Sequence, residues 1–316
     1  MSERRVPTRE EVMAYLTDRN NWGRWGPDDE RGAMNLITDE KRVAATRLVR
    51  SGRTVSMSRY WKTGGVAGNL YPAQHYMKAS YRHDEGDRGS ASDFLGAFYH
   101  GRAFTHIDAL CHVWGADGMW NGRDPKEELT FDGSKWGGID VWSDGVLTRG
   151  VLLDIPRLRG VPYVTEDNPV HGWDLEDAAK AQGIAIQPGD VVAVYSGREK
   201  WQADHPDVTY GTQEILDDLV RISKPGLHAS CLPFIRDNDI SALAWDMMDA
   251  YPDGYDFPNP VHCAIYAYGI SLLDNCLLQP LAEACQEEGR YEFMLVVSPL
   301  KVQGATGSPA NPLAVF

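Results

Sequence analysis

The chain has 316 residues, with 31 Lys or Arg against 45 Asp or Glu, and its formal net charge at pH 7 is −14. Hydrophobic residues make up 43% of the chain and charged residues 24%, as in globular proteins that bury a core. The acidic balance argues against a nucleic-acid-binding protein and against binding to an anionic membrane surface, because both require a basic face.

One domain is predicted over residues 1–316, with an N-terminal arm over about residues 1–50. The length suits one large α/β domain, and the sequence contains no repeat and no linker. No apolar run approaches the ~20 residues that span a bilayer, and the charged N-terminus lacks the apolar centre of a signal peptide. Five cysteines without a Cys-x-x-Cys pair favour reduced thiols, so we expect a cytoplasmic protein.

Four helices are predicted from their capping residues. Each begins near a side chain that can accept hydrogen bonds from free backbone N–H groups, or at a proline, and two of them end at a glycine. The signals in chain order are Thr8, Thr38 with a helix running to about residue 50, Asp174 with a stop at Gly183, and Pro280 with a stop at Gly289.

Strands are predicted between these helices, where β-branched and other apolar residues cluster. They cover residues 54–60, 150–155, 190–196, 240–245 and 293–297. Strand and helix signals alternate from Leu152 onward, which favours an α/β fold with a mixed sheet. Phosphate-binding glycine loops, the G-x-S-x-G elbow and the H-E-x-x-H helix are missing, so nucleotide binding and serine hydrolysis lose their usual support.

The densest group of candidate ligands lies in residues 99–112. In an extended segment, His106 and Asp108 share one face at roughly 6–7 Å and could bind one cation. His112 lies four residues beyond Asp108, so one helical turn would direct it to the same point. Imidazole and carboxylate ligands suit Zn²⁺, Mn²⁺ or Fe²⁺. The alternative is that these histidines are buried, hydrogen-bonded residues of an aromatic-rich segment.

Three further candidates are less local. Six extended residues would carry His100 roughly 20 Å from His106, so it can join the site only if the chain folds back near Gly101. His262 and Asp274 form a second candidate pair, with His262 on a helix and Asp274 at the end of an apolar strand; a core histidine and an N-cap aspartate explain this pair equally well.

Two weaker candidates concern the substrate and a nucleophile. Residues 69–77 suggest a substrate-covering loop in which His75 would face the pocket, with an ordinary surface loop as the alternative. Cys111 adjoins His112, but no base is evident beside it, so a small buried packing residue is the preferred interpretation.

Residues 105–112 resemble the T-H-x-D-A/T-x-x-H signature of the cyclase family, which includes bacterial kynurenine formamidase and isatin hydrolase. The similarity extends along nearly the whole chain. Residues 25–35 resemble the opening of the longer members, residues 189–192 the family's G-D strand, and residues 299–309 its closing loop. The chain therefore resembles the longer subfamily.

The resemblance implies a swivelling β/β/α fold around a barrel-like core. It also implies that His106 and Asp108 bind a metal, with His112 as the acid/base. His262 and Asp274 match the distal His-x11-Glu pair, which contributes to a second metal or to substrate contact. The segment around His228 resembles a stretch of the longer members, which makes His228 a second pocket candidate; a structural histidine is the alternative.

Two departures from the family pattern matter. Short members carry a metal-binding histidine where this chain has Arg102, and His100 is the expected substitute. The distal glutamate is Asp274 here, one methylene shorter, which puts a second metal in doubt more than the first.

The chemistry implied is hydrolysis of a small amide, cyclic amide or lactone, with Zn²⁺ or Mn²⁺ activating water and His112 moving the proton. Two alternatives stay open: a metal-dependent lyase or cyclase acting on a small carbonyl compound, and a catalytically silent binding protein. The expected partners are a small-molecule substrate and further copies of the chain, in a homodimer or homotetramer.

Overall fold

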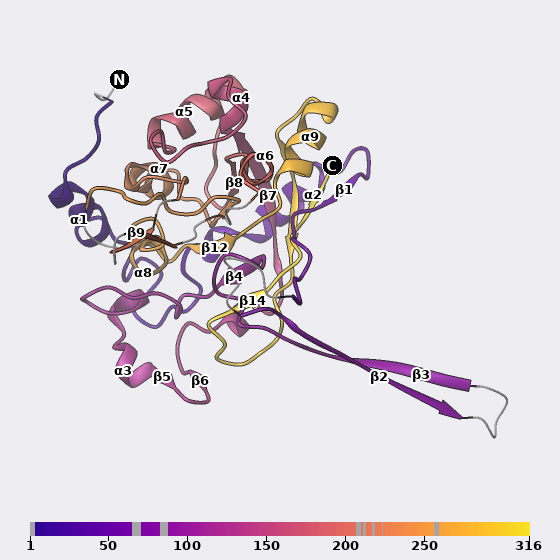
Figure 1. The fold of residues 1–316 in the computed structure, drawn as a ribbon. Helices are drawn as coiled ribbons and strands as arrows, with labels where there is room; N and C mark the ends of the chain where they lie inside the picture. The colour runs from indigo at the N-terminus through magenta and orange to yellow at the C-terminus, as the bar shows by residue number, and fades with distance from the viewer. Residues whose placement is uncertain are drawn as a thin grey trace.

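The computed structural model describes residues 4–64, 71–82, 88–206, 210, 213–216, 219–222, 224–255 and 259–316. Its centre is a nine-stranded mixed sheet that curves through the molecule (Figure 1). The four middle strands are parallel and their outer neighbours are antiparallel. In spatial order the strands are β1 (Thr54–Ser56), β15 (Leu313–Val315), β13 (Glu292–Val297), β7 (Val146–Asp154), β8 (Val191–Tyr195), β11 (Ala242–Trp245), β12 (Ser271–Asp274), β4 (His106–Asp108) and β14 (Gly307–Pro309).

The parallel strands β8, β11 and β12 are buried along their whole length. This explains why their sequences are near-continuous apolar runs, since parallel strands are covered on both faces. Helices connect and cover them (Figure 1). The predicted α/β class with a mixed sheet is therefore confirmed, and each of the five predicted strands overlaps an observed one.

The helices follow the predicted capping signals, with two corrections. Thr8 and Glu11 form a reciprocal capping box at α1 (Arg9–Thr17), Thr38 caps α2 (Asp39–Thr46), and Gly289 ends α9 (Gln279–Glu288) in a left-handed conformation. Helix α2 ends at Thr46 rather than near residue 50.

The second correction concerns α5 (Gly172–Ala181), where Asp174 was expected as the cap. His171 occupies the cap position, and Asp174 lies inside the first turn, where its carboxylate accepts a hydrogen bond from the His171 N–H. The remaining helices are α3 (Pro125–Glu128), α4 (Ile155–Arg159), α6 (Arg198–Asp204), α7 (Leu232–Asp237) and α8 (Ala264–Tyr268), with short 3-10 turns at Gly32–Leu36, Trp120–Gly122, Ile139–Trp142 and Ala229–Cys231.

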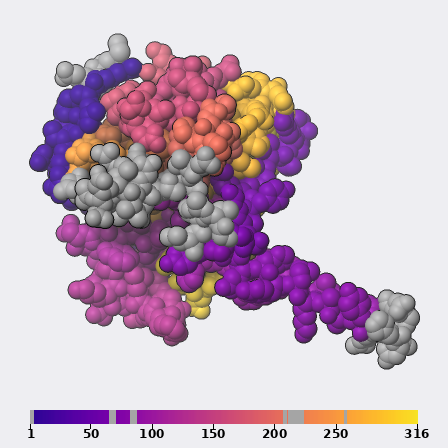
Figure 2. Space-filling view, viewed as in Figure 1, coloured from indigo at the N-terminus to yellow at the C-terminus, as the bar shows by residue number. Residues whose placement is uncertain are grey.

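A long hairpin stands apart from this body. Strands β2 (Gln74–Arg82) and β3 (Arg88–Gly96) pair only with each other and project outward (Figures 1 and 2). The sequence analysis treated residues 69–77 as a loop; residues 71–77 form the base of this hairpin, and residues 69 and 70 lie outside the described residues. The two other small hairpins are β5 (Leu129–Thr130) with β6 (Gly133–Ser134), and β9 (Gln213–Leu216) with β10 (Leu219–Ile222).

Strand β4 lies between β12 and β14, close to the point where β11 and β12 end. In α/β sheets, ligands bind at the carboxyl ends of parallel strands. Helix α1 packs against α7 and α8 on the same side of the molecule. No helix among the described residues has the length and apolar character needed to cross a membrane.

Candidate metal centre

Pairing of β4 with its neighbours brings the first ligands together. His106 lies directly opposite Asp274 on β12, and Asp108 lies opposite Gly307 on β14. Because His106 and Asp108 are two residues apart on a strand, they share a face. His106 Nε2 lies 3.4 Å from Asp108 Oδ1 and 3.8 Å from Asp274 Oδ2. The sheet register thus joins the two candidate groups that the sequence placed more than 160 residues apart.

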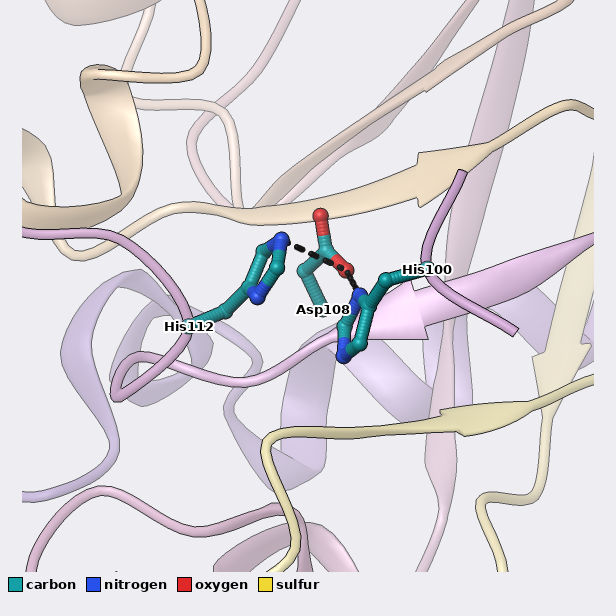
Figure 3. A group of neighbouring side chains, drawn as sticks. All are labelled: His100, Asp108 and His112. Carbon is teal, nitrogen blue, oxygen red and sulfur yellow. Dashed lines mark ion pairs between the residues drawn. The ribbon is translucent and has the colours of Figure 1, made fainter. Parts of the chain in front are cut away.

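His100 and His112 lie side by side next to the carboxylate of Asp108 (Figure 3). His100 Nδ1 lies 3.0 Å and His112 Nε2 3.9 Å from Asp108 Oδ1, and the two imidazole rings stack with centroids 3.7 Å apart. His112 is on the turn after β4, as its spacing predicted; its N–H donates to the Ala109 carbonyl.

The chain folds back at Gly101, as the sequence required for His100 to take part. Gly101 has φ +143°, a conformation that favours glycine. Gly307 provides the space: a Cβ there would lie 3.0 Å from the His100 ring and 2.5 Å from the Ile107 carbonyl oxygen. His100 therefore lies beside His106, His112 and Asp108, and its role as a substitute for a histidine at Arg102 stays a prediction.

Hydrogen bonds orient two of the imidazoles so that one nitrogen of each faces the centre. His106 Nδ1 donates to the Phe104 carbonyl, 2.9 Å away, which directs Nε2 toward Asp108 and Asp274. His100 Nε2 pairs with the Thr306 hydroxyl at 2.9 Å, while Nδ1 faces Asp108. Such outer contacts are typical of histidines that bind metals.

The distal pair of His262 and Asp274 has a third partner, Asp249, which was not predicted from the sequence. His262 Nδ1 contacts the carboxylate of Asp249, which also accepts a hydrogen bond from the Val261 N–H, and His262 Nε2 lies 3.2 Å from Asp274 Oδ2. His262 precedes α8 rather than lying on it. Asp249 follows the end of β11 by four residues, and its place at the carboxyl end of a parallel strand was the one available signal.

The residues present fit a divalent cation. Asp108 is fully buried, and among the described residues neither of its oxygens accepts a hydrogen bond; His100 Nδ1 is likewise buried without one. A buried carboxylate that lacks well-aligned hydrogen-bond donors is costly, and a cation among the neighbouring imidazoles would offset this cost. Two groups of ligand atoms, each within 4.8 Å, share Asp108: His100–Asp108–His112 and His106–Asp108–Asp274. Imidazole and carboxylate donors suit Zn²⁺ or Mn²⁺.

Electrostatics separate the histidines into two kinds. Burial lowers the pKa of His112 to about 4, so this imidazole is neutral and can accept a proton at pH 7. For His106, burial is outweighed by Asp108 and Asp274, which raise its pKa to about 8. Asp249 and Asp274 likewise hold the pKa of His262 well above its ordinary value in spite of burial. Burial raises the pKa of Asp108, but the neighbouring imidazoles of His112, His106 and His100 outweigh it and keep this pKa well below its usual range.

The cluster opens into a pocket of about 590 Å³. Four residues of the cluster line it: His106, His112, His262 and Asp274. Helix α1, which the sequence analysis did not connect with the site, contributes Arg9, Met13 and Leu16 to the wall. The remaining lining residues are Gly101, Arg102, Val113, Trp114, Gly115, Lys224, Met248, Asn259, Cys263 and Tyr266.

The structure does not bring His75 or His228 to this pocket. His75 lies on the projecting strand β2, with Nε2 3.2 Å from Asp93 Oδ2. His228 is buried, precedes a 3-10 turn and accepts a hydrogen bond from the Ser230 N–H. Cys111 is also buried, and burial raises the pKa of its thiol to about 11, which agrees with its interpretation as a packing residue.

Residues 77–250 match the family described as "Putative cyclase". The chain belongs to this cyclase family. A crystal structure described as a novel cyclase is 28% identical to it, with a TM-score of 0.79 and a match that covers 94% of this chain and 99% of that one. The predicted family and the cyclase-like fold, with its curled mixed sheet, are thereby confirmed.

Two isatin hydrolases share the fold at lower identity. Isatin hydrolase A from Ralstonia solanacearum is 15% identical with a TM-score of 0.56, and the match covers 83% of this chain and 91% of that one. Isatin hydrolase A from Labrenzia aggregata, bound to benzyl benzoate, is 16% identical with a TM-score of 0.55 and coverage of 88% and 98%. No match was found among curated proteins.

Proposed function

We propose that this cyclase-family protein is a metal-dependent hydrolase of a small amide, cyclic amide or lactone. The observation that carries the proposal is Asp108. Among the described residues, this fully buried carboxylate accepts no well-aligned hydrogen bond, and it lies 3.0–3.9 Å from three imidazoles, two of which line the pocket. The fold shared with proteins named isatin hydrolase supports a hydrolase.

His100, His106 and Asp108 would hold the cation, Zn²⁺ or Mn²⁺, with Asp274 beside them. When bound, such a cation would act as a Lewis acid and lower the pKa of water, so that hydroxide is available near neutral pH to attack a carbonyl carbon. A small substrate in the pocket would lie next to the cation, because His106 and Asp274 line the pocket.

His112 is the proposed acid/base. Its Nε2 faces the cluster, its ring lines the pocket, and its low pKa of about 4 keeps it neutral at pH 7. A neutral Nε2 accepts the proton that water loses on attack, and the resulting imidazolium donates it to the leaving nitrogen or oxygen. The proton is thus returned within one catalytic cycle.

His262, in the distal pair, carries a second proton, because Asp249 and Asp274 raise its pKa. Asp249 contacts His262 Nδ1 and Asp274 faces Nε2, so the ring is fixed between two carboxylates. In this position His262 contacts the substrate carbonyl or, in its neutral form, contributes to a second cation with Asp274.

Hydrolysis is tested by the source of the product oxygen. The metal-loaded protein is incubated with N-formyl amides, cyclic amides and lactones in water labelled with heavy oxygen, and products are analysed by mass spectrometry. We expect one solvent oxygen in the new carboxylate, and loss of turnover in His112→Ala with metal retained. Product without label would contradict hydrolysis and support the lyase or cyclase alternative.

We also propose that the chain assembles as a homodimer or homotetramer through the β2–β3 hairpin. A two-stranded hairpin is marginally stable alone in water, yet this one exposes Tyr76, Met77, Phe94 and Leu95, each by 54–62%. A second copy that packs on these side chains would stabilise it.

Light scattering after gel filtration tests this assembly. We expect a multiple of 35.2 kDa for the unaltered chain and a smaller species for a Tyr76→Ser, Phe94→Ser double variant. Tyr60→Ser, at a tyrosine that is 94% exposed outside the hairpin, is the matched control and should leave the mass unchanged. A monomeric unaltered chain would contradict the proposal.

A further inference from the structure

The wall of the pocket carries positive charge although the chain as a whole is acidic. Among its described lining residues, Arg9, Arg102 and Lys224 are cationic and Asp274 is the one carboxylate. The whole chain has a formal net charge of −14. A pocket whose charge opposes that of the protein concentrates ligands of the opposite sign.

Lys224 is the most constrained of the three cations. It is 4% exposed, and its backbone is held by two hydrogen bonds with Tyr251, at 2.9 and 3.0 Å. Its Nζ donates to Asn259 Oδ1 at 3.1 Å, and no carboxylate among the described residues forms an ion pair with it. An ammonium group has three N–H donors. Among the described residues no second acceptor contacts Nζ, so its other N–H groups can bind a group inside the pocket. Asp249, Asp274 and Asp253 act on the ammonium through their charge, but none of them forms a direct ion pair with it, and a buried cation without such a pair is costly.

Arg102 is held at the same wall by its backbone. The Arg102 carbonyl accepts a hydrogen bond from the buried Arg198 guanidinium at 2.7 Å. Arg198 also donates to Asn275 Oδ1 at 2.7 Å, and Asn275 donates to the Gly101 carbonyl. This network joins the turn that carries Arg102 to the residue after Asp274, so the side chain enters the pocket from a fixed backbone.

The two cations act on each other. Burial lowers the pKa of Lys224; the charges of Asp249, Asp274 and Asp253 oppose this effect and the charge of Arg102 adds to it. Like charges in one buried wall repel, and an anion between them removes the repulsion. A guanidinium beside an ammonium suits a carboxylate in particular, because the planar fork of arginine matches its two oxygens.

We propose that Lys224 and Arg102 form a subsite for a carboxylate group of the substrate. This deepens, and rests on, the proposed hydrolase function: the substrate is then a small anionic amide or lactone. Its apolar part contacts Met13, Val113 and Met248, and its reacting carbonyl points to His106 and His112. The repulsion between a carboxylate and Asp274 disfavours the reverse orientation.

Titration calorimetry with benzoate and its neutral isostere benzamide tests the subsite. We expect the metal-loaded protein to bind benzoate about tenfold or more tightly than benzamide, and Lys224→Met to lose about tenfold of that preference. Lys224→Arg keeps the charge and should keep most of the preference. Lys200→Met, at an exposed lysine paired with Asp204, is the matched control and should change nothing.

The outcomes separate this inference from the hydrolase proposal. A Lys224→Met protein that keeps its metal and its full preference for benzoate overturns the subsite, since the preference then comes from the metal. Loss of the preference in a protein that hydrolyses no amide or lactone supports the subsite and contradicts the hydrolase function. Thermal melting of Lys224→Met and Lys224→Arg distinguishes a lost subsite from a lost fold.

Discussion

The pocket has two groups of buried charged side chains, one around His106 and one around Lys224, and the cost of burying charge is offset differently in each group. In the group on and around β4, imidazole nitrogens and carboxylate oxygens lie 3.0–3.9 Å apart. A cation would further stabilise the buried carboxylate of Asp108. In the wall that contains Lys224, this lysine has an amide as its neighbour and no ion-pair partner among the described residues, so an anionic ligand would stabilise it. Under the two proposals, the β4 wall holds a cofactor and the wall that contains Lys224 selects the substrate.

The largest effect is expected at the residue shared by both groups of ligand atoms. Asp108→Asn keeps the side-chain volume but removes the negative charge that a cation needs, so metal binding and activity should both fall by more than about 100-fold. Metal titration followed by calorimetry measures this. Asp93→Asn, in the exposed His75–Asp93 pair, is the control; equal loss in both variants would mean that the effect is not specific to the β4 wall.

A smaller effect is expected at Asp249, which positions His262. In Asp249→Asn, His262 loses its fixed orientation, and kcat should fall about 10- to 100-fold while the metal held by His100, His106 and Asp108 is retained. The pH dependence of kcat should also change, because Asp249 raises the pKa of His262. An unchanged pH profile with reduced kcat would show a structural role alone.

A change in the wall that contains Lys224 should affect substrate binding rather than turnover. With an anionic substrate, Lys224→Met should raise KM about tenfold and leave kcat within about twofold, because the carboxylate is bound equally in the ground state and the transition state. With a neutral analogue KM should not change. Equal losses with both substrates would remove the distinction between the two walls.

The last prediction concerns folding stability and His228, a buried histidine outside both walls. Burial lowers its pKa to about 4, below the ordinary 6.5. Between these two values the unfolded chain binds more protons than the folded one, so stability falls as the pH drops from about 6.5 toward 4. Near pH 5 this costs about 2 kcal/mol. His228→Asn should flatten the fall in denaturation curves between about pH 7.5 and 5; an equally steep fall would contradict this origin.

The sequence predicted the part of the site that is local. His106, Asp108 and His112 lie within seven residues, and strand and turn geometry were enough to bring them together. His100 was predicted conditionally, because its return depends on Gly101 and on the space above Gly307. Asp274 lies beside these residues because β12 pairs with β4. The apolar run before Asp274 predicted a strand but not its pairing partner.

The other wall could not be predicted, because its residues come from separate segments. Arg9, Arg102 and Lys224 line one pocket although they are far apart in the sequence, and Arg9 joins it through the packing of α1 against α7 and α8, which no periodic pattern encodes. Asp249 reaches His262 across a loop in the same way. Capping signals located the helices well, whereas the β2–β3 hairpin, exposed on both faces, has no buried face to impose an alternating pattern.

Metal content tests the central claim most directly. Protein purified without chelator or histidine tag is compared with His106→Ala by elemental analysis. The cluster around Asp108 predicts about one or two equivalents of zinc or manganese per chain, lost in the variant. No metal in the unaltered protein, even after incubation with zinc and manganese, would contradict the hydrolase mechanism and favour a binding protein without catalytic activity.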